Sequence, residues 1–220
     1  MLAKVLSGAL LGIDAYPVEV EVDIAQGLPQ FATVGLPEGA VKESKDRVKS
    51  AIKNSGYEFP TRRITINLAP ADIRKEGAAF DLPMAVGLLT ATGLVPLERS
   101  SRFLLMGELS LDGCIKPVRG VLPVAAAARR WDLDGLILPA ANAEEGALAD
   151  GLPVYPAGTL GDVVDFLTGN RVLEPFRIDI SSMIGQAVQD DVDFSDVRGQ
   201  DHVKRALEVA AAGGHNILML

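Results

Sequence analysis

The chain has 220 residues, of which 48% are hydrophobic and 23% charged, a balance typical of a globular protein and not of a disordered one. Its net charge of −8 argues against a generally basic nucleic-acid binder. The single cysteine, Cys114, excludes a disulfide within the chain. Because a lone cysteine fits a reducing compartment, we expect a cytoplasmic protein. No apolar run is long enough to cross a bilayer, so no membrane partner is expected.

The amino-terminal region predicts three strands. Residues 3–11 are mostly apolar, and we interpret them as a buried strand, with a signal peptide as the alternative. Residues 17–25 alternate strictly between β-branched and acidic side chains, which predicts a strand with one exposed face. A third strand is expected at about residues 30–34.

Two helices and a strand are predicted next. Residues 38–54 place Val41, Val48 and Ile52 on one stripe of a helix, and residues 63–67 form a short β-branched strand. Residues 82–92 read as an apolar helix with a proline in its first turn and a glycine just past its end.

From residue 103 onward the pattern changes to alternating strands and helices. Residues 103–118 predict a hairpin around Asp112–Gly113, a dipeptide that permits a type I′ turn. The elements expected after it are helices at 121–131, 142–149 and 159–168 and strands at 135–138 and 152–155. Because this alternation implies parallel crossovers, residues 1–170 are predicted to form an α/β domain with an antiparallel half and a βαβ half.

The last fifty residues predict a linker and the beginning of a second domain. Residues 171–192 lack clear periodicity and are interpreted as the linker. Within residues 193–220 we expect a helix at 202–212 and a buried strand at 217–220. Because these two elements are too small to bury a core, they are interpreted as the start of an incomplete domain.

Four separated blocks carry a resemblance to a known family. They are VGLPEGAVKESKDRV at 34–48, ITINLAPADIRKEGAAFDLPMAVGLL at 64–89, MGELSLDGCIKPVRGVLP at 106–123 and DFSDVRGQDHVKRALEVAAAGGHNILML at 193–220. Together they resemble the Mg-chelatase-like ComM/YifB family of bacterial AAA+ ATPases. The resemblance implies a two-layer, Lon-protease-like or ribosomal-protein-like fold, followed by a linker and the first helix and strand of an AAA+ core.

The resemblance also bears on nucleotide binding. In the family the last strand runs into a Walker A loop, and the pattern G-x-x-x-x-G-K-[ST] is absent from this sequence. We therefore expect no ATP hydrolysis and no cofactor in this chain alone, and ATP and Mg²⁺ in the full-length protein. The segment similar to VRGQ lies against the adenine in AAA+ proteins, so Val197, Gly199 and Gln200 are candidates for a partial nucleotide site.

The first domain resembles the protease domain of Lon and the Lon-like domain of RadA. In Lon-type enzymes a nucleophilic serine and a general-base lysine occupy positions that match Ala79 and Leu122 here. Neither side chain can attack a carbonyl or accept a proton, so no catalytic residue is expected. Ser110 and Cys114 are the next candidate nucleophiles, and no motif places a base beside them.

Two smaller features have structural interpretations. Asp81 precedes an apolar helix, so we expect it to be an N-cap, with a binding role as the alternative. His202, His215 and Cys114 are too few and too widely spaced for a zinc site, and we predict no metal site.

Basic residues gather in one part of the sequence. Residues 42–75 hold nine of the 21 lysines and arginines. These side chains can form a solvated helix flank or a ridge that follows a phosphate backbone. The candidate DNA-binding residues are Lys42, Lys45, Lys49, Lys53, Arg62, Arg63, Arg74 and Lys75. Tyr57 and Phe59 are the only rings nearby, so backbone contact is expected more than base stacking.

Three functions are consistent with these observations. The leading hypothesis is a non-proteolytic module that mediates DNA or subunit contacts of an AAA+ motor. Here the resemblance implies ATP-driven branch migration of single-stranded or branched DNA in recombination and natural transformation, by a homo-oligomer expected to be a hexamer. The alternatives are a Lon-like serine peptidase with a displaced nucleophile and a metal-inserting subunit of the Mg-chelatase type.

Overall fold

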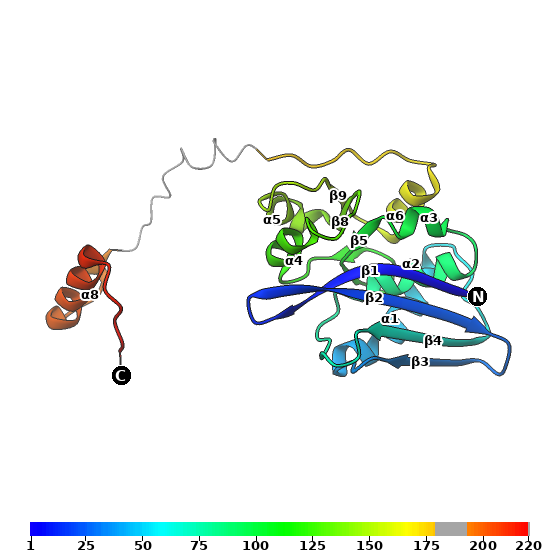
Figure 1. Cartoon of the computed structure of the whole chain (residues 1–220), viewed down its shortest axis with the longest axis horizontal. Coiled ribbons are helices and arrows are strands. Elements are labelled where there is room, and N and C mark those ends of the chain that lie inside the picture. Colours follow the sequence, from blue (N-terminus) through cyan, green and yellow to red (C-terminus); the bar gives the residue numbers. More distant parts are fainter. Residues whose placement is uncertain (179–192, 220) are drawn as a thin grey trace. The chain divides into compact units, whose positions relative to one another are not determined.

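A mixed sheet of seven strands, in the order β3-β4-β2-β1-β5-β8-β9, organises the amino-terminal part of the protein (Figure 1). Its strands are β1 (Leu2–Leu11), β2 (Asp14–Ala25), β3 (Gln30–Val34), β4 (Arg63–Ala69), β5 (Phe103–Leu105), β8 (Gly135–Pro139) and β9 (Val154–Ala157). Strand β2 is antiparallel to β1 and β4, and the other neighbours are parallel. The predicted α/β fold, with an antiparallel half and a βαβ half, is confirmed.

The computed structural model describes residues 1–178 and 193–219, and of Ala40 and Lys42 it describes the backbone alone. The chain divides into two units, Met1–Ile178 and Asp179–Leu220. The first unit contains the sheet and its helices. The second contains a short 3₁₀ turn, η2 (Phe194–Asp196), and the helix α8 (Asp201–Gly213).

The antiparallel half shows why alternation in the sequence becomes a half-exposed sheet. Val18, Val20 and Val22 of β2 are fully buried, whereas Glu19 and Asp23 on the opposite face are exposed. Strand β1 lies in the middle of the sheet, between β2 and β5. The interpretation of residues 3–11 as a strand is therefore confirmed.

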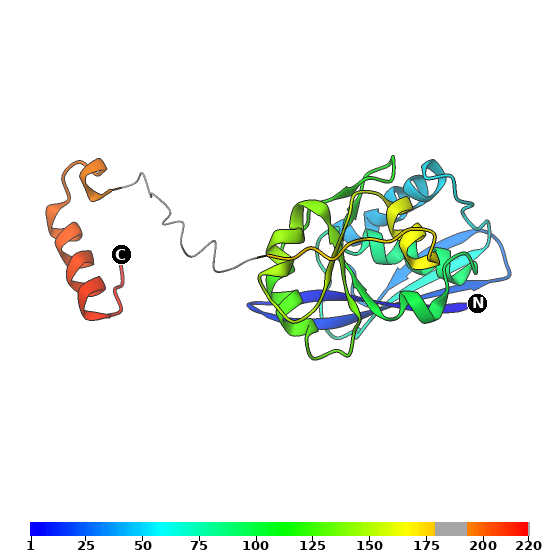
Figure 2. The same ribbon diagram turned by 90° about the horizontal axis from the view of Figure 1, so that it is seen from above.

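Helices cover the sheet unequally. Helices α1 (Gly39–Asn54), α2 (Asp81–Ala91) and α6 (Leu160–Thr168) contribute to the larger hydrophobic cluster, together with the buried faces of β1, β2 and β4. Helices α4 (Val121–Ala128) and α5 (Ala143–Ala147) form a second cluster with β5, β8 and β9. Figure 2 shows α1 on the side of the first unit away from the β1–β2 ribbon. On the other face of this ribbon, Val124 of α4 packs against Gly8 of β1.

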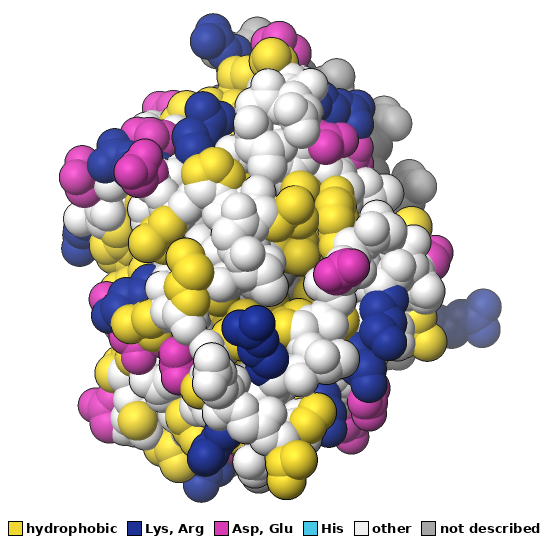
Figure 3. All heavy atoms as spheres, turned by 90° about the vertical axis from the view of Figure 1, so that its right-hand side faces the viewer, with side chains coloured by type: hydrophobic (Ala, Val, Ile, Leu, Met, Phe, Trp, Pro, Cys, Tyr) yellow, Lys and Arg dark blue, Asp and Glu magenta, His cyan; other side chains and the backbone are white. Residues whose placement is uncertain are grey.

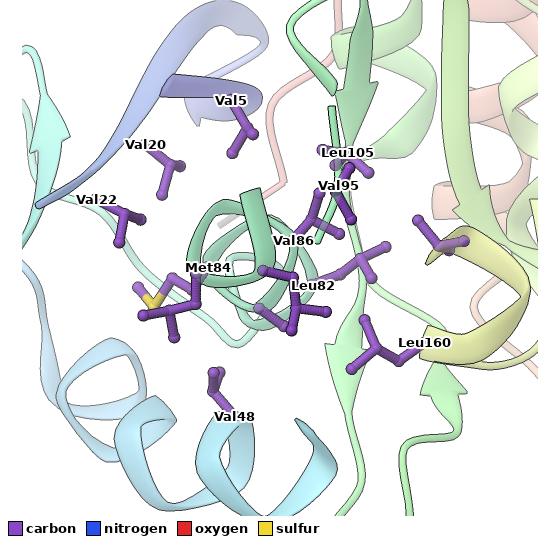
Figure 4. Packing of buried hydrophobic residues seen from close by; sticks show 14 of the residues in the cluster. Val5, Val20, Val22, Val48, Leu82, Met84, Val86, Val95, Leu105 and Leu160 are labelled. Carbon is purple, nitrogen blue, oxygen red and sulfur yellow. The ribbon is translucent and has the colours of Figure 1, made fainter. Parts of the chain in front are cut away.

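Helix α2 is the centre of the core. All its residues are buried, as expected for a helix that is apolar on every side. Figure 4 shows Val5 and Val20 of the sheet on one side of α2 and Val48 of α1 on the other. The sheet and α1 therefore enclose α2 between them.

The hairpin predicted at residues 103–118 is wrong in part. Strand β5 pairs with β1 and β8 in the large sheet, and the hairpin contains only β6 (Glu108–Leu109) and β7 (Ile115–Lys116). Its turn is not type I′, because Gly113 has a φ of 88° whereas Asp112 is not among the described residues with positive φ. Instead the Asp112 carboxylate accepts a hydrogen bond from the Cys114 amide at 3.0 Å.

The carboxy-terminal predictions have mixed outcomes. The helix predicted at 202–212 is confirmed as α8, whereas residues 217–219 are not a strand, because the second unit, as far as it is described, offers no neighbouring strand to pair with. Of the predicted linker, residues 179–192 lie outside the described part. The part of the predicted linker that precedes residue 179 runs alongside β9 at one point, where the Phe176 amide donates to the Val154 carbonyl at 2.7 Å. Among the described residues no helix is long and apolar enough to cross a membrane.

Candidate functional site

A cleft of about 1010 Å³ opens where the end of β1, the loop at residues 72–80 and the start of α4 meet. Ala79 lines it, together with Arg74, Glu76, Glu108 and Arg119. Among its lining residues in the described chain, none carries a hydroxyl, thiol, amine or imidazole group. The cleft therefore offers charged groups for binding, and its lining includes carboxylates but no hydroxyl, thiol or amine that could act as the nucleophile or base of a Ser–Lys dyad.

The α4 residue that shares this cleft with Ala79 is Val124 and not Leu122. Leu122 is 39% exposed and its amide donates to Glu145 Oε1 at 3.1 Å, outside the cleft. Two residues along a helix correspond to a rotation of about 200°, so these side chains point to opposite sides of α4. Both are apolar, and neither position supplies the amine of a Ser–Lys dyad.

The two other candidate nucleophiles lie together in the β6–β7 turn. The Ser110 hydroxyl lies 2.8 Å from Asp112 Oδ1 and 3.0 Å from the Cys114 carbonyl, and Cys114 Sγ lies 3.5 Å from Asp112 Oδ2. The hydrogen bond to Asp112 raises the pKa of the Cys114 thiol above its ordinary value. Because the thiolate is the reactive form, Asp112 disfavours nucleophilic chemistry at this turn.

This environment predicts the reactivity of Cys114. We expect Asp112→Asn to lower the Cys114 pKa and to accelerate its alkylation by iodoacetamide at about pH 7.5 by roughly threefold or more, because more thiolate is present. The rate is measured by mass spectrometry, with Asp132→Asn as the matched loss of a distant carboxylate. An unchanged rate in Asp112→Asn would contradict the inferred role of this carboxylate.

Asp81 is not the N-cap that the sequence predicts. Phe80 occupies that position, and Asp81, fully buried, is the first residue of α2. Its Oδ2 and Oδ1 accept from Arg47 Nε at 2.7 Å and Arg47 Nη2 at 3.1 Å, and Oδ2 accepts from the Leu109 amide at 3.3 Å. The carboxylate thus joins α1, α2 and β6. This interaction raises the pKa of Arg47, chiefly through the hydrogen bonds from Arg47 to Asp81.

Most of the basic residues predicted to bind DNA lie on the surface. Three exposed lysines, Lys45, Lys49 and Lys53, follow one flank of α1. Arg62 and Arg63 are exposed at the start of β4. None of these five side chains takes part in the ion pairs found among the described residues. The side chain of Lys42 lies outside the described part.

Lys53 and Arg62 come together at a shallow concavity of about 650 Å³, which Tyr57 and Phe59 also line. Figure 3 shows the side of the molecule that carries the β2–β3 turn, where lysine and arginine side chains lie among uncharged and acidic ones.

Two residues of this zone have other roles. Arg74 Nη1 pairs with Glu38 Oε1 at 3.2 Å. Lys75 is fully buried, and its ammonium donates to the carbonyls of Pro70 and Ile73, the latter at 2.7 Å. Burial lowers the pKa of Lys75. Lys75 therefore stabilises its own loop, and the prediction that it forms part of an exposed phosphate-binding surface is wrong.

The second unit places the partial nucleotide-site candidates at the start of α8. Val197 is 46% exposed, and Gly199 and Gln200 have positive φ values of 70° and 56°. The Val197 carbonyl accepts a hydrogen bond from the Lys204 ammonium. His202 and His215 are exposed. Within the described residues, no three His, Cys, Asp or Glu side chains cluster as metal ligands.

The mixed sheet, the buried central helix and the cleft at Ala79 define a Lon-protease-like domain without a Ser–Lys dyad at the expected positions. Lon protease 2 of Bacillus subtilis is 28% identical over 193 residues, or 80% of this chain and 33% of that protein. The family model described as subunit ChlI of Mg-chelatase matches residues 20–142, and the model described as magnesium chelatase, subunit ChlI, matches residues 193–220. The chain belongs to this Mg-chelatase ChlI-like family.

Similarity to two further proteins extends over the whole chain. Competence protein ComM of Haemophilus influenzae is 43% identical over 100% of this chain and 43% of that protein. Protein YifB of Salmonella typhimurium is 45% identical over 100% of this chain and 42% of that protein. The chain thus spans about two fifths of the length of these relatives.

Proposed function

We propose that this chain is the non-proteolytic amino-terminal part of a ComM/YifB-type AAA+ ATPase and that it contacts DNA, with subunit contacts as a further role of its surface. The single observation that carries the proposal is the exposed flank of Lys45, Lys49 and Lys53, which form no ion pair with the described residues of an otherwise acidic protein. A relative that covers the whole chain is named a competence protein, which agrees with a role in DNA handling. The parent protein is proposed to use ATP and Mg²⁺ as a hexamer that drives branch migration.

The geometry of α1 suits contact with a phosphate backbone. Lys45, Lys49 and Lys53 are each four residues apart, so they rise about 6 Å from one to the next along the same flank. Each phosphate that such a lysine neutralises releases condensed counterions, which makes binding favourable and dependent on salt. Aromatic stacking is a smaller contribution, because Tyr57 and Phe59 are both partly buried.

The test is the salt dependence of DNA binding. We expect the 220-residue chain to shift labelled single-stranded or branched DNA at low salt. The triple reversal Lys45→Glu, Lys49→Glu and Arg62→Glu should weaken binding and reduce the slope of log affinity against log salt by about 3, one unit for each lost cation.

A matched control uses a cation elsewhere on the surface. Arg130→Glu, just after α4, changes the net charge without touching the α1 flank and should reduce the slope by less than about 1. If the triple variant binds DNA with the affinity and salt dependence of the unaltered chain, this surface does not contact DNA.

A further inference from the structure

The outer edge of β3 carries no charge and no bulge, and prolines flank the strand only at Pro29 and Pro37. Strand β3 hydrogen-bonds to β4 on one side and is the last strand of the sheet on the other (Figure 1). Residues 24–37 contain no charged side chain, and the β3–β4 register from Gln30 to Val34 runs without a bulge. Proteins normally block such edges with charges, prolines, bulges or covering segments, because the free N–H and C=O groups accept another strand.

The opposite edge of the same sheet is protected. There the chain after α6 returns along β9, and the Phe176 amide donates to the Val154 carbonyl at 2.7 Å. At the end of β3, in contrast, the apolar side chains of Val34, its last residue, and of Leu36 are 45% and 52% exposed. One edge is thus covered by the chain itself, and the other is left open with apolar side chains at its end.

The beginning of β3 lies next to the basic concavity, which it reaches through the contact of Phe31 with Phe59. Gln30, the first residue of β3, is paired in register with Arg63, and Phe31 stacks on Phe59 with 6.5 Å between ring centroids. Phe59 in turn lines the concavity that holds Lys53 and Arg62, which also contains Glu58. Figure 3 faces the end of the sheet where β3 and β4 begin.

We propose that β3 accepts an extended segment of a partner protein as an additional strand, and that acidic side chains at one end of this segment bind Lys53 and Arg62 in the adjoining concavity. Backbone hydrogen bonds to the open edge supply sequence-independent affinity. The two cations select an acidic end, and the exposed apolar residues at the end of β3 select alternating apolar positions. This binding mode uses backbone groups of β3 that DNA contact through α1 does not require.

The test measures fluorescence anisotropy of labelled peptides with the 220-residue chain. Two peptides alternate valine and threonine and carry two glutamates, one at the amino-terminal and the other at the carboxy-terminal end. One of them should bind, and its end identifies the strand direction. Replacing its glutamates by lysines, or introducing Arg62→Glu in the protein, should weaken binding about tenfold.

Strand addition is tested specifically with two versions of the binding peptide, each methylated on one of the two alternate sets of backbone nitrogens. The set whose methyl groups face β3 should lose at least about tenfold in affinity, because those N–H groups can no longer donate, while the alternate set should retain binding. Equal binding by both sets, or no binding by either glutamate peptide, overturns the proposal.

Measuring DNA binding and peptide binding on the same chain separates this site from the DNA surface. If the chain binds DNA with normal affinity but binds both methylated peptides equally, the DNA proposal stands and the strand site is excluded. If the chain distinguishes the two methylated peptides but does not bind DNA, the strand site stands and the DNA proposal is excluded. If the chain associates with itself, and if this self-association by itself prevents peptide binding, the occupant of the β3 edge is a second copy of the chain. This result would also overturn the proposal of a partner protein.

Discussion

Arg47→Ala is expected to lower the free energy of unfolding by roughly 3 kcal/mol and the melting temperature by about 10 °C. The substitution leaves the Asp81 carboxylate, which is fully buried, with the hydrogen bond from the Leu109 amide but without the cation that pairs with it. An uncompensated buried charge costs far more than a lost surface ion pair. Thermal unfolding followed by circular dichroism measures the effect.

Two further variants show whether the unpaired charge is the cause. Arg47→Lys keeps the positive charge but loses the two-point contact, so it should fall between Ala and the unaltered chain. The double variant Arg47→Met with Asp81→Leu removes both charges and should recover most of the stability. If the double variant is as unstable as Arg47→Ala, packing of the arginine stem and not the buried carboxylate determines the loss. Because the pKa of Arg47 is raised, its charge is lost only in strongly alkaline solution, and the comparison holds at neutral pH.

Asp81 also shows where local sequence is insufficient. An acidic residue just before an apolar helix is typical of an N-cap. Its actual partner, Arg47, lies 34 residues earlier on α1, and no short-range pattern shows that α1 will pack against this end of α2. The alternation of β2 and the apolar character of α2, in contrast, are properties of single segments, and both were predictable.

The candidate site divides in the same way. That position 79 carries no hydroxyl is read directly from the sequence, whereas its match to the Lon nucleophile stays a prediction. The match of Leu122 to the general-base lysine also stays a prediction. The α4 residue that lines the cleft is Val124, two residues further along the helix, and which residue of α4 faces the cleft could not be fixed from sequence. The burial of Lys75 was equally hidden, because a lysine beside Arg74 and Glu76 has the sequence context of a surface residue.

Gly35→Ala is the second substitution with a large expected effect, and it acts on the junction between β3 and α1. Gly35 has a φ of 94°, and a Cβ placed there would lie 2.2 Å from the Leu68 carbonyl oxygen. The clash is with backbone of β4, which cannot rotate away as a side chain can. Strained φ and steric overlap together should lower the free energy of unfolding by about 3 kcal/mol or more, measured by thermal or denaturant unfolding.

Gly12→Ala separates strain from steric overlap. Gly12 also has a positive φ, of 65°, but no atom lies within 4 Å of the position that a Cβ would take there, so a loss of about 1 kcal/mol is expected. Equal losses in the two variants would show that the junction can shift to accept a side chain. The larger loss at Gly35 has a consequence beyond stability, because the Leu36 carbonyl accepts from the Lys75 amide at 3.3 Å and the Glu38 amide donates to the Lys75 carbonyl at 3.0 Å. A displaced junction would therefore also move the loop that carries Ala79, so Gly35→Ala should disturb the open β3 edge and the cleft together.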